Sequence, residues 1–213
     1  MRFEELLNLA GGQPVFDLAT LVQLSAPNRP GLRVQLSRWI HAGRLLPLRR
    51  GMYALADQYR RAPVNPAALA NLLYRPSYLS ARWALGFYGM IPERVSTLTS
   101  VTTRVPRTFN NAFGEFEYRH VKRPVFSGYA PVMLDGQKVL LADPEKALLD
   151  LWHLERGDWT AERMVEMRFQ SCELVKITRL KRYAVLFDSP RLLRAVATWR
   201  QLAASDEEGT VEI

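Results

Sequence analysis

Six polar side chains near the start of the chain could hydrogen-bond to DNA from one side of a predicted helix. They are Arg33, Gln35, Ser37, Arg38, His41 and Arg44, and no carboxylate lies among them. Leu32, Leu36, Trp39 and Ile40 form the opposite, apolar stripe of this helix, predicted over residues 32–42. Arginine suits O6 and N7 of guanine, and glutamine suits adenine. Solvated helix faces usually mix acids with bases, so the spacing favours contact with nucleic acid.

Two more arginines, Arg49 and Arg50, lie in a short turn between two predicted strands. Residues 45–48 and 52–55 are apolar runs of strand length, separated by the two arginines and Gly51. A basic turn at this place would meet phosphates or the minor groove. The alternative interpretation is a β-turn made of ordinary soluble residues.

The elements that must position these side chains follow the order of a winged helix-turn-helix. Residues 1–10 predict a short helix ended by Gly11-Gly12, residues 14–16 are extended, and Asp17 caps a helix that runs to Ser25. A turn over residues 26–31 precedes the third helix, which Gly43 closes. The phrase GRLLPLRRGMY resembles the passage from helix to wing in such domains. We therefore predict a DNA-binding domain over residues 1–60 whose third helix enters the major groove.

Residues 61–213 predict a second, mixed α/β domain, so the whole chain is predicted to be α+β. Asn65-Pro66 begins a helix, and Tyr78 to Tyr88 is a strongly apolar helical run. Alternating β-branched residues predict a strand over 95–105, and a second strand is expected over 115–122. Asp135-Gly136 predicts a hairpin within 132–141. Helices are predicted from Asp143-Pro144 and over 160–169, 176–187 and 190–203, followed by a disordered acidic tail at 206–209.

Composition narrows the range of partners. The net charge is +8, which favours a polyanion. Cys172 is the only cysteine, so one chain can form neither a disulfide nor a thiolate metal site, as expected in a reducing cytoplasm. Residues 1–10 lack the basic start and apolar run that a signal peptide needs, and no apolar run in the sequence approaches 18 residues. We expect a cytoplasmic protein without a membrane partner.

The sequence contains no recognisable catalytic or phosphate-binding motif. His41, His120 and His153 lie far apart in the sequence, and no glycine-rich phosphate loop is present. Asp135 with Lys138, or Glu115 with Glu117, could act as nuclease carboxylates, but a hairpin turn and an exposed strand explain them more simply. We therefore predict no enzyme activity, no catalytic residues, no metal and no cofactor.

Four phrases in order resemble a known family. PSYLSARWALGFYGMIPE, TLTSVTTRVPR, FEYRHVK and DPEKALLDL are similar to the second domain of the AbiE-type antitoxins of bacterial type IV toxin–antitoxin systems, also described as AbiEi-family regulators. The resemblance covers about residues 5 to 155. It implies a winged-helix protein that represses its own operon and counters a nucleotidyltransferase-like toxin. The winged-helix part of the resemblance includes residues 33–44 and 49–50, which it implies contact DNA.

The two predicted roles, repression and neutralisation of a toxin, involve different partners. Double-stranded DNA is the partner predicted from the residues, and the resemblance implies that it is the chain's own promoter. Because one small domain buries limited surface on DNA, we expect two copies on an inverted repeat or help from the second domain. The toxin partner is implied by the resemblance alone. The alternative is a winged-helix regulator or a protein-interaction module without a toxin. A basic helix containing Lys176, Arg179, Lys181 and Arg182 could serve flanking DNA or an acidic protein, or be a solvated face.

Overall fold

The N-terminal sixty residues combine three helices with a small sheet. The structure is a computed structural model that describes residues 1–10, 13–24 and 31–209. Its first elements, in chain order, are α1 (Phe3–Ala10), β1 (Val15–Asp17), α2 (Leu18–Leu24), α3 (Leu32–His41), β2 (Leu45–Arg49) and β3 (Met52–Leu55). The strands pair antiparallel in the order β1-β3-β2. The predicted glycine pair and most of the turn over residues 26–31 lie outside the described residues.

Local signals set the ends of these elements as predicted. The backbone N–H of Thr20 donates to Asp17 Oδ1 at 2.7 Å, which satisfies an amide in the first turn of α2. Gly43 follows α3 with φ +66°, a left-handed conformation that a glycine adopts without steric cost. Gly51, at φ +78°, closes the turn between β2 and β3. The hairpin that bears Arg49 and Arg50 is therefore present.

Beyond a 3₁₀ turn at Asp57–Tyr59, a six-stranded sheet forms the centre of the molecule. Its order is β6-β7-β5-β4-β9-β8, with parallel pairs β4–β9 and β5–β7 and antiparallel pairs elsewhere. The strands are β4 (Ser77–Leu79), β5 (Leu98–Thr102), β6 (Arg107–Asn111), β7 (Gly114–His120), β8 (Tyr129–Leu134) and β9 (Gln137–Ala142). The helices are α4 (Pro66–Leu73), α5 (Ala81–Phe87), α6 (Pro144–Leu154), α7 (Ala161–Glu166), α8 (Ile177–Leu186) and α9 (Pro190–Gly209). The predicted α+β class is confirmed.

Helices cover both faces of this sheet. Tyr118 of β7 donates its hydroxyl to the carbonyl oxygen of Ala70 in α4, at 2.5 Å. Tyr78 of β4 points to the other side, where its hydroxyl donates to Asp150 Oδ2 of α6 at 3.0 Å. Because both faces are covered, polar side chains inside the sheet need partners within the protein.

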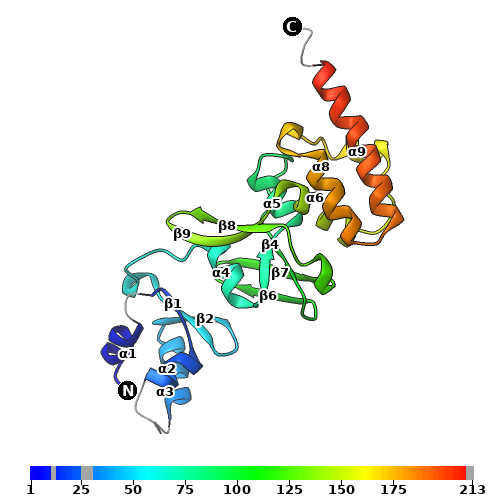
Figure 1. The fold of residues 1–213 in the computed structure, drawn as a ribbon. Helices are drawn as coiled ribbons and strands as arrows, with labels where there is room; N and C mark the ends of the chain where they lie inside the picture. Colours follow the sequence, from blue (N-terminus) through cyan, green and yellow to red (C-terminus); the bar gives the residue numbers. More distant parts are fainter. Residues whose placement is uncertain (11–12, 25–30, 210–213) are drawn as a thin grey trace.

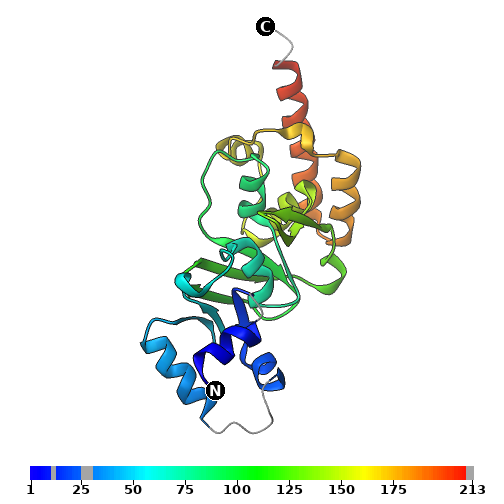
Figure 2. The ribbon, with the colours of Figure 1, turned by 90° about the vertical axis from the view of Figure 1, so that its left-hand side faces the viewer.

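The parts form three successive tiers (Figures 1 and 2). The N-terminal region lies at one end, the six-stranded sheet in the middle, and α6, α8 and α9 at the other end. One apolar core belongs to the N-terminal region and includes Leu6, Leu21 and Leu36. The other face of the β2–β3 hairpin contributes Leu48 and Met52 to the larger core. The hairpin is thus packed against the sheet, and α3 lies on the side of the N-terminal region away from it (Figures 1 and 2).

Two predicted elements of the second region have different bounds. The helix expected from Tyr78 begins only at Ala81, because Tyr78 and Leu79 pair with β5 as part of a buried strand. The strand expected over 95–105 spans Leu98–Thr102. The alternation of residue types along this strand does not distinguish a buried face from an exposed one. Leu98, Ser100 and Thr102 are buried on one face, and Val101 is buried on the other. A central strand covered on both sides has no solvent face.

Two further differences concern segments with weak sequence signals. Residues 107–111 form the edge strand β6, for which no strand was predicted from the sequence. Residues 206–209, expected to be a disordered tail, continue the backbone of α9. Helices propagate more easily than they nucleate, so an established helix can extend into polar residues.

Candidate nucleic-acid interface

The outward side of α3 carries most of the predicted contact residues. Arg33, Ser37, Arg38 and His41 are exposed, whereas Leu32 and Leu36 of the same helix are buried. Val34 lies among them and is 56% exposed. Val34 was not among the predicted contact residues, although its place between Arg33 and Arg38 indicates the same face, and an apolar side chain there can contact the methyl group of thymine. No acidic residue occurs in α3.

A groove runs between α3, α2 and the β2–β3 hairpin. Its volume is about 930 Å³. Arg33 and Ser37 line it from the helix, and Arg49 and Arg50 line it from the hairpin. One carboxylate, that of Asp17, also lines the groove, but it accepts hydrogen bonds from the backbone N–H and the hydroxyl of Thr20 at 2.7 and 3.0 Å. The groove therefore brings together four of the eight predicted contact residues, two from the helix and two from the hairpin.

The two hairpin arginines differ in exposure. Arg50 is exposed. Arg49 is half-buried, its Nη1 donates to the carbonyl oxygen of Arg50 at 3.1 Å, and its Nε is buried without a hydrogen-bond partner among the described residues. Arg50 is thus the more accessible cation, and Arg49 lies at the contact between the hairpin and the sheet.

Three arginines of the second region lie beside the hairpin. A smaller hollow of about 290 Å³ is lined by Arg49, Arg50, Arg75, Arg104 and Arg107, which we call the arginine cluster. Its lining contains no carboxylate. The guanidinium carbon of Arg104 lies 4.1 Å from the centre of the Tyr74 ring, and that of Arg107 lies 5.7 Å from it. The ring holds both cations by cation–π attraction. Arg104 Nη1 also donates to the carbonyl oxygen of Arg75 at 3.1 Å, which fixes Arg104 beside Arg75.

Other predicted contact residues lie outside the groove. Gln35 is half-buried, while Arg44 is placed with its guanidinium carbon 5.1 Å from the centre of the Phe3 ring in α1. His41 is exposed, and its Nδ1 lies 2.8 Å from the carbonyl oxygen of Ser37, one turn earlier in α3. Arg33, Ser37, Arg49 and Arg50 thus form one group. Arg38 and His41 continue the helix face, and Arg44 belongs to the contact with α1.

The residues considered for catalysis have structural partners. Glu117 pairs with Arg119 at 3.1 Å, Glu115 accepts from the Thr97 hydroxyl at 3.0 Å, and Asp135 accepts from the Asn65 amide at 3.3 Å. Burial lowers the pKa of His153, whose ring packs on Phe187. No three His, Cys, Asp or Glu side chains lie together as a metal site in residues 1–10, 13–24 and 31–209.

The basic helix α8 is partly neutralised. Arg179 Nη1 lies 3.5 Å from Glu145 Oε2 and 3.8 Å from Asp143 Oδ2. Lys181 and Arg182 remain exposed.

Comparisons with known proteins add no assignment. No family model matches the chain, and no curated protein matches it. Within the described residues, no helix has the length and apolar character needed to cross a membrane.

Proposed function

We propose that residues 1–60 are a winged helix-turn-helix that binds double-stranded DNA, with α3 in the major groove and the β2–β3 hairpin as the wing. The observation that carries the proposal is the groove in which Arg33 and Ser37 of α3 face Arg49 and Arg50 of the hairpin. Among the described residues, Arg33, Arg38 and Arg50 form no ion pair with a carboxylate. Unneutralised cations on an exposed helix and an adjacent loop are suited to a DNA groove and the phosphates beside it.

Each part of this surface has its own role. Arg33 and Arg38 hydrogen-bond to guanine edges, Ser37 to a base or phosphate, and Val34 contacts a thymine methyl. Arg50 contacts phosphate beside the helix, which positions the protein without reading sequence. The arginine cluster extends the positive surface from the wing onto β6, so Arg104 and Arg107 contact flanking phosphates. Two copies on an inverted repeat in the chain's own promoter would supply the specificity that one module lacks.

The family resemblance extends the proposal to autorepression and to an antitoxin role against a nucleotidyltransferase-like toxin. The phrases behind it, in β4, β5, β7 and α6, supply mainly buried side chains such as Tyr78, Phe116 and Lys146. Buried residues support a shared fold rather than a docking surface. Co-expression with a nucleotidyltransferase-like neighbour tests this role. Restored growth supports the antitoxin, and unrelieved toxicity leaves a regulator without a toxin partner.

Fluorescence anisotropy with a labelled duplex of the chain's own promoter tests DNA binding. Arg33→Ala and Arg38→Ala should each weaken specific binding by about 1–3 kcal/mol and relax the preference for one base pair. Arg200→Ala is the matched control, because it removes the same charge from the exposed side of α9, at the other end of the molecule.

The proposal fails if Arg33→Ala, Arg38→Ala and Arg200→Ala bind the promoter as tightly as the unaltered chain. A pure protein-interaction module would show little salt-dependent affinity for any duplex, and a nuclease would cleave plasmid in the presence of magnesium. We expect salt-dependent binding and no cleavage.

A further inference from the structure

A second cavity lies between the N-terminal region and α4, on the side of the sheet near β9. Its volume is about 830 Å³, within the range of pockets that hold small ligands. Gln13, Pro14 and Val15 line it from the N-terminal region, and residues of α4, β4, β8 and β9 line it from the second region. We call it the α4 cleft. It is separate from the groove beside α3, which shares none of its lining residues.

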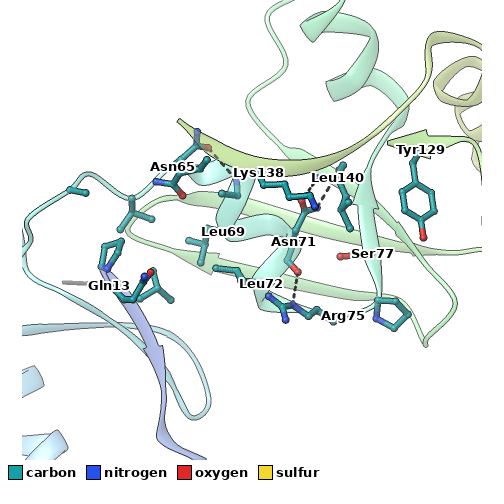
Figure 3. Close-up of a pocket in the computed structure, with 17 residues that line it drawn as sticks. Gln13, Asn65, Leu69, Asn71, Leu72, Arg75, Ser77, Tyr129, Lys138 and Leu140 are labelled. Atoms are coloured by element: carbon teal, nitrogen blue, oxygen red, sulfur yellow. Dashed lines mark hydrogen bonds between the residues drawn. The ribbon is translucent and has the colours of Figure 1, made fainter. Parts of the chain in front are cut away.

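Polar side chains lie at both ends of the α4 cleft, and apolar side chains of α4 lie between them (Figure 3). Ser77 and Tyr129 lie at one end, with Arg75 beside them, whereas Gln13 and Asn65 lie at the other. Leu69 and Leu72 of α4 lie between the two ends (Figure 3).

The hydroxyl of Ser77 lacks a partner in the described structure. Ser77 is only 3% exposed, lines the α4 cleft, and its Oγ makes no hydrogen bond. Leaving a buried hydroxyl unsatisfied has a free-energy cost, which a ligand in the cleft would remove by accepting its proton in a hydrogen bond. The Asn71 amide, in contrast, is fully engaged: its Oδ1 accepts from the Leu140 N–H at 2.6 Å, and its Nδ2 donates to the Leu140 carbonyl at 3.4 Å.

The Tyr129 ring is held in place at the Ser77 end of the cleft. It stacks on Tyr78 with ring centres 4.4 Å apart and an angle of 13° between the planes. Because Tyr78 points to the α6 side of the sheet, the Tyr129 ring closes this end of the cleft, and no hydrogen bond to a ligand is assigned to its hydroxyl.

The charge of the lining is positive. Arg75 and Lys138 line the cleft, and none of the lining residues carries a carboxylate. The guanidinium of Arg75 makes one long hydrogen bond, from Nε to the Asn71 carbonyl oxygen at 3.4 Å. Its other N–H groups have no acceptor among the described residues, so they are available to a carboxylate, which arginine can bind through two parallel hydrogen bonds.

We propose that the α4 cleft binds a small carboxylate with a flat apolar body. The carboxylate lies at Arg75 and Ser77, and the apolar body lies along Leu69 and Leu72 toward the N-terminal segment. Because Arg75 also lines the arginine cluster, an occupied cleft neutralises one cation of that cluster. This consequence for DNA rests on the proposed function, but binding of the carboxylate itself does not.

Isothermal titration of the full chain with 2-naphthoate, in the absence of DNA, tests the site. We expect saturable binding with one site per chain. The neutral analogue 2-naphthamide should bind at least about tenfold more weakly, because it loses the charge-assisted hydrogen bonds. Arg75→Gln should weaken binding of 2-naphthoate by a similar factor.

Ser77→Ala provides the sharpest variant, since its hydroxyl has no partner to lose in the unbound protein. It should weaken 2-naphthoate about fivefold. Ser100→Ala is the matched control: Ser100 is fully buried in the same sheet, its hydroxyl also lacks a partner, and it does not line the cleft. Circular dichroism checks the fold of each variant.

Saturable binding that Ser77→Ala weakens and Ser100→Ala does not supports the proposal. Absence of saturable binding, equal affinity for naphthoate and naphthamide, or equal effects of the two serine variants overturns it. Because no duplex is present, none of these results depends on DNA binding.

Discussion

The arginine side chains of α3 and of the hairpin tip are exposed, whereas the charged side chains at the centre of α6 form a buried ion pair. In the N-terminal region, Arg33, Arg38 and Arg50 face solvent. In the second region, Lys146 and Asp150 of α6 are at most 1% exposed and pair with each other, and Asp150 also accepts from the hydroxyls of Ser80 and Tyr78 at 2.7 and 3.0 Å. Burial lowers the pKa of Lys146, and Asp150 partly opposes that change.

This difference distinguishes charged groups that stabilise the fold from charged groups that can bind a partner. A buried ion pair must satisfy its own hydrogen bonds, because removing either partner leaves an uncompensated charge in the core. A cation left unneutralised at the surface stabilises the fold little and remains available to a partner. Substitutions in α6 should therefore act on stability, and substitutions in α3 and the hairpin should act on binding.

The largest effect is expected from Asp150→Asn, which leaves Lys146 buried without its counter-charge. We expect the free energy of unfolding to fall by about 3–5 kcal/mol, measured by urea unfolding at pH 7 with tryptophan fluorescence. The control is Glu117→Gln, which breaks the Arg119–Glu117 pair, whose side chains are 41% and 34% exposed. That change should cost less than about 1 kcal/mol. Equal losses in the two variants would contradict a distinction between buried and exposed charge.

A smaller effect is expected from Arg50→Ala combined with Arg107→Ala. If both cations contact phosphate, affinity should fall alike for promoter and unrelated duplexes. The slope of log K against log salt concentration should decrease in magnitude by about 0.9 for each lost contact. Anisotropy titrations at several salt concentrations measure it. An unchanged slope would remove the wing and β6 from the interface.

Alkaline pH should lower the free energy of unfolding through ionisation of the half-buried Tyr88. Burial, with smaller contributions from Asp143 and Glu145, raises the pKa of Tyr88 to about 12. The folded state thus keeps a proton that the unfolded chain releases near pH 10. Stability from this group is complete below pH 10 and is lost as pH rises through about 12. Its share is about 1 kcal/mol once partial exposure is allowed for.

Tyr88→Phe tests that dependence. Its hydroxyl donates to the Ala142 carbonyl at 2.9 Å, so the variant should be slightly less stable at pH 8. It should also lose less stability between pH 10 and 12, as measured by urea unfolding across that range. An identical pH dependence in both proteins would show that Tyr88 does not retain its proton.

The smallest effect is expected from Arg44→Gln. Because Arg44 lies over the Phe3 ring, its loss should reduce the free energy of unfolding by about 0.5–1 kcal/mol. Promoter affinity should change much less than with Arg33→Ala. A loss of affinity as large as that of Arg33→Ala would return Arg44 to the DNA contacts that the sequence predicted.

Local signals made much of the fold predictable. Asp17, Gly43, Asn65 and the Asp135-Gly136 turn act on their immediate neighbours, so their effects can be inferred without the rest of the chain. Asn65 Oδ1, for example, accepts from the N–H of Ala67 at 2.8 Å and so begins α4. Tyr78 and Leu79 could not be assigned this way, because an apolar run of that length suits a buried strand or a helix, and only pairing with β5 decides between them.

In the candidate interface, too, local features could be predicted from the sequence, and contacts between distant segments could not. The face of α3 was predictable, since a helix of period 3.6 fixes which side chains share a side. Arg75, Arg104 and Arg107 are separated from the hairpin in sequence and join Arg49 and Arg50 only because β6 packs beside β2. The contact of Arg44 with Phe3 could not be predicted for a related reason: Arg44 follows α3, and this contact depends on where α1 packs.

Alkylation of a single cysteine placed on α3 tests most directly whether this face meets DNA. In a Cys172→Ser background, Ser37→Cys places a thiol in the groove, and Ala197→Cys places one on the exposed side of α9. With saturating promoter duplex, confirmed by anisotropy, maleimide labelling of the Ser37→Cys variant should slow strongly, while labelling of the Ala197→Cys variant should not change. Undiminished labelling of the Ser37→Cys variant on bound DNA would contradict the account.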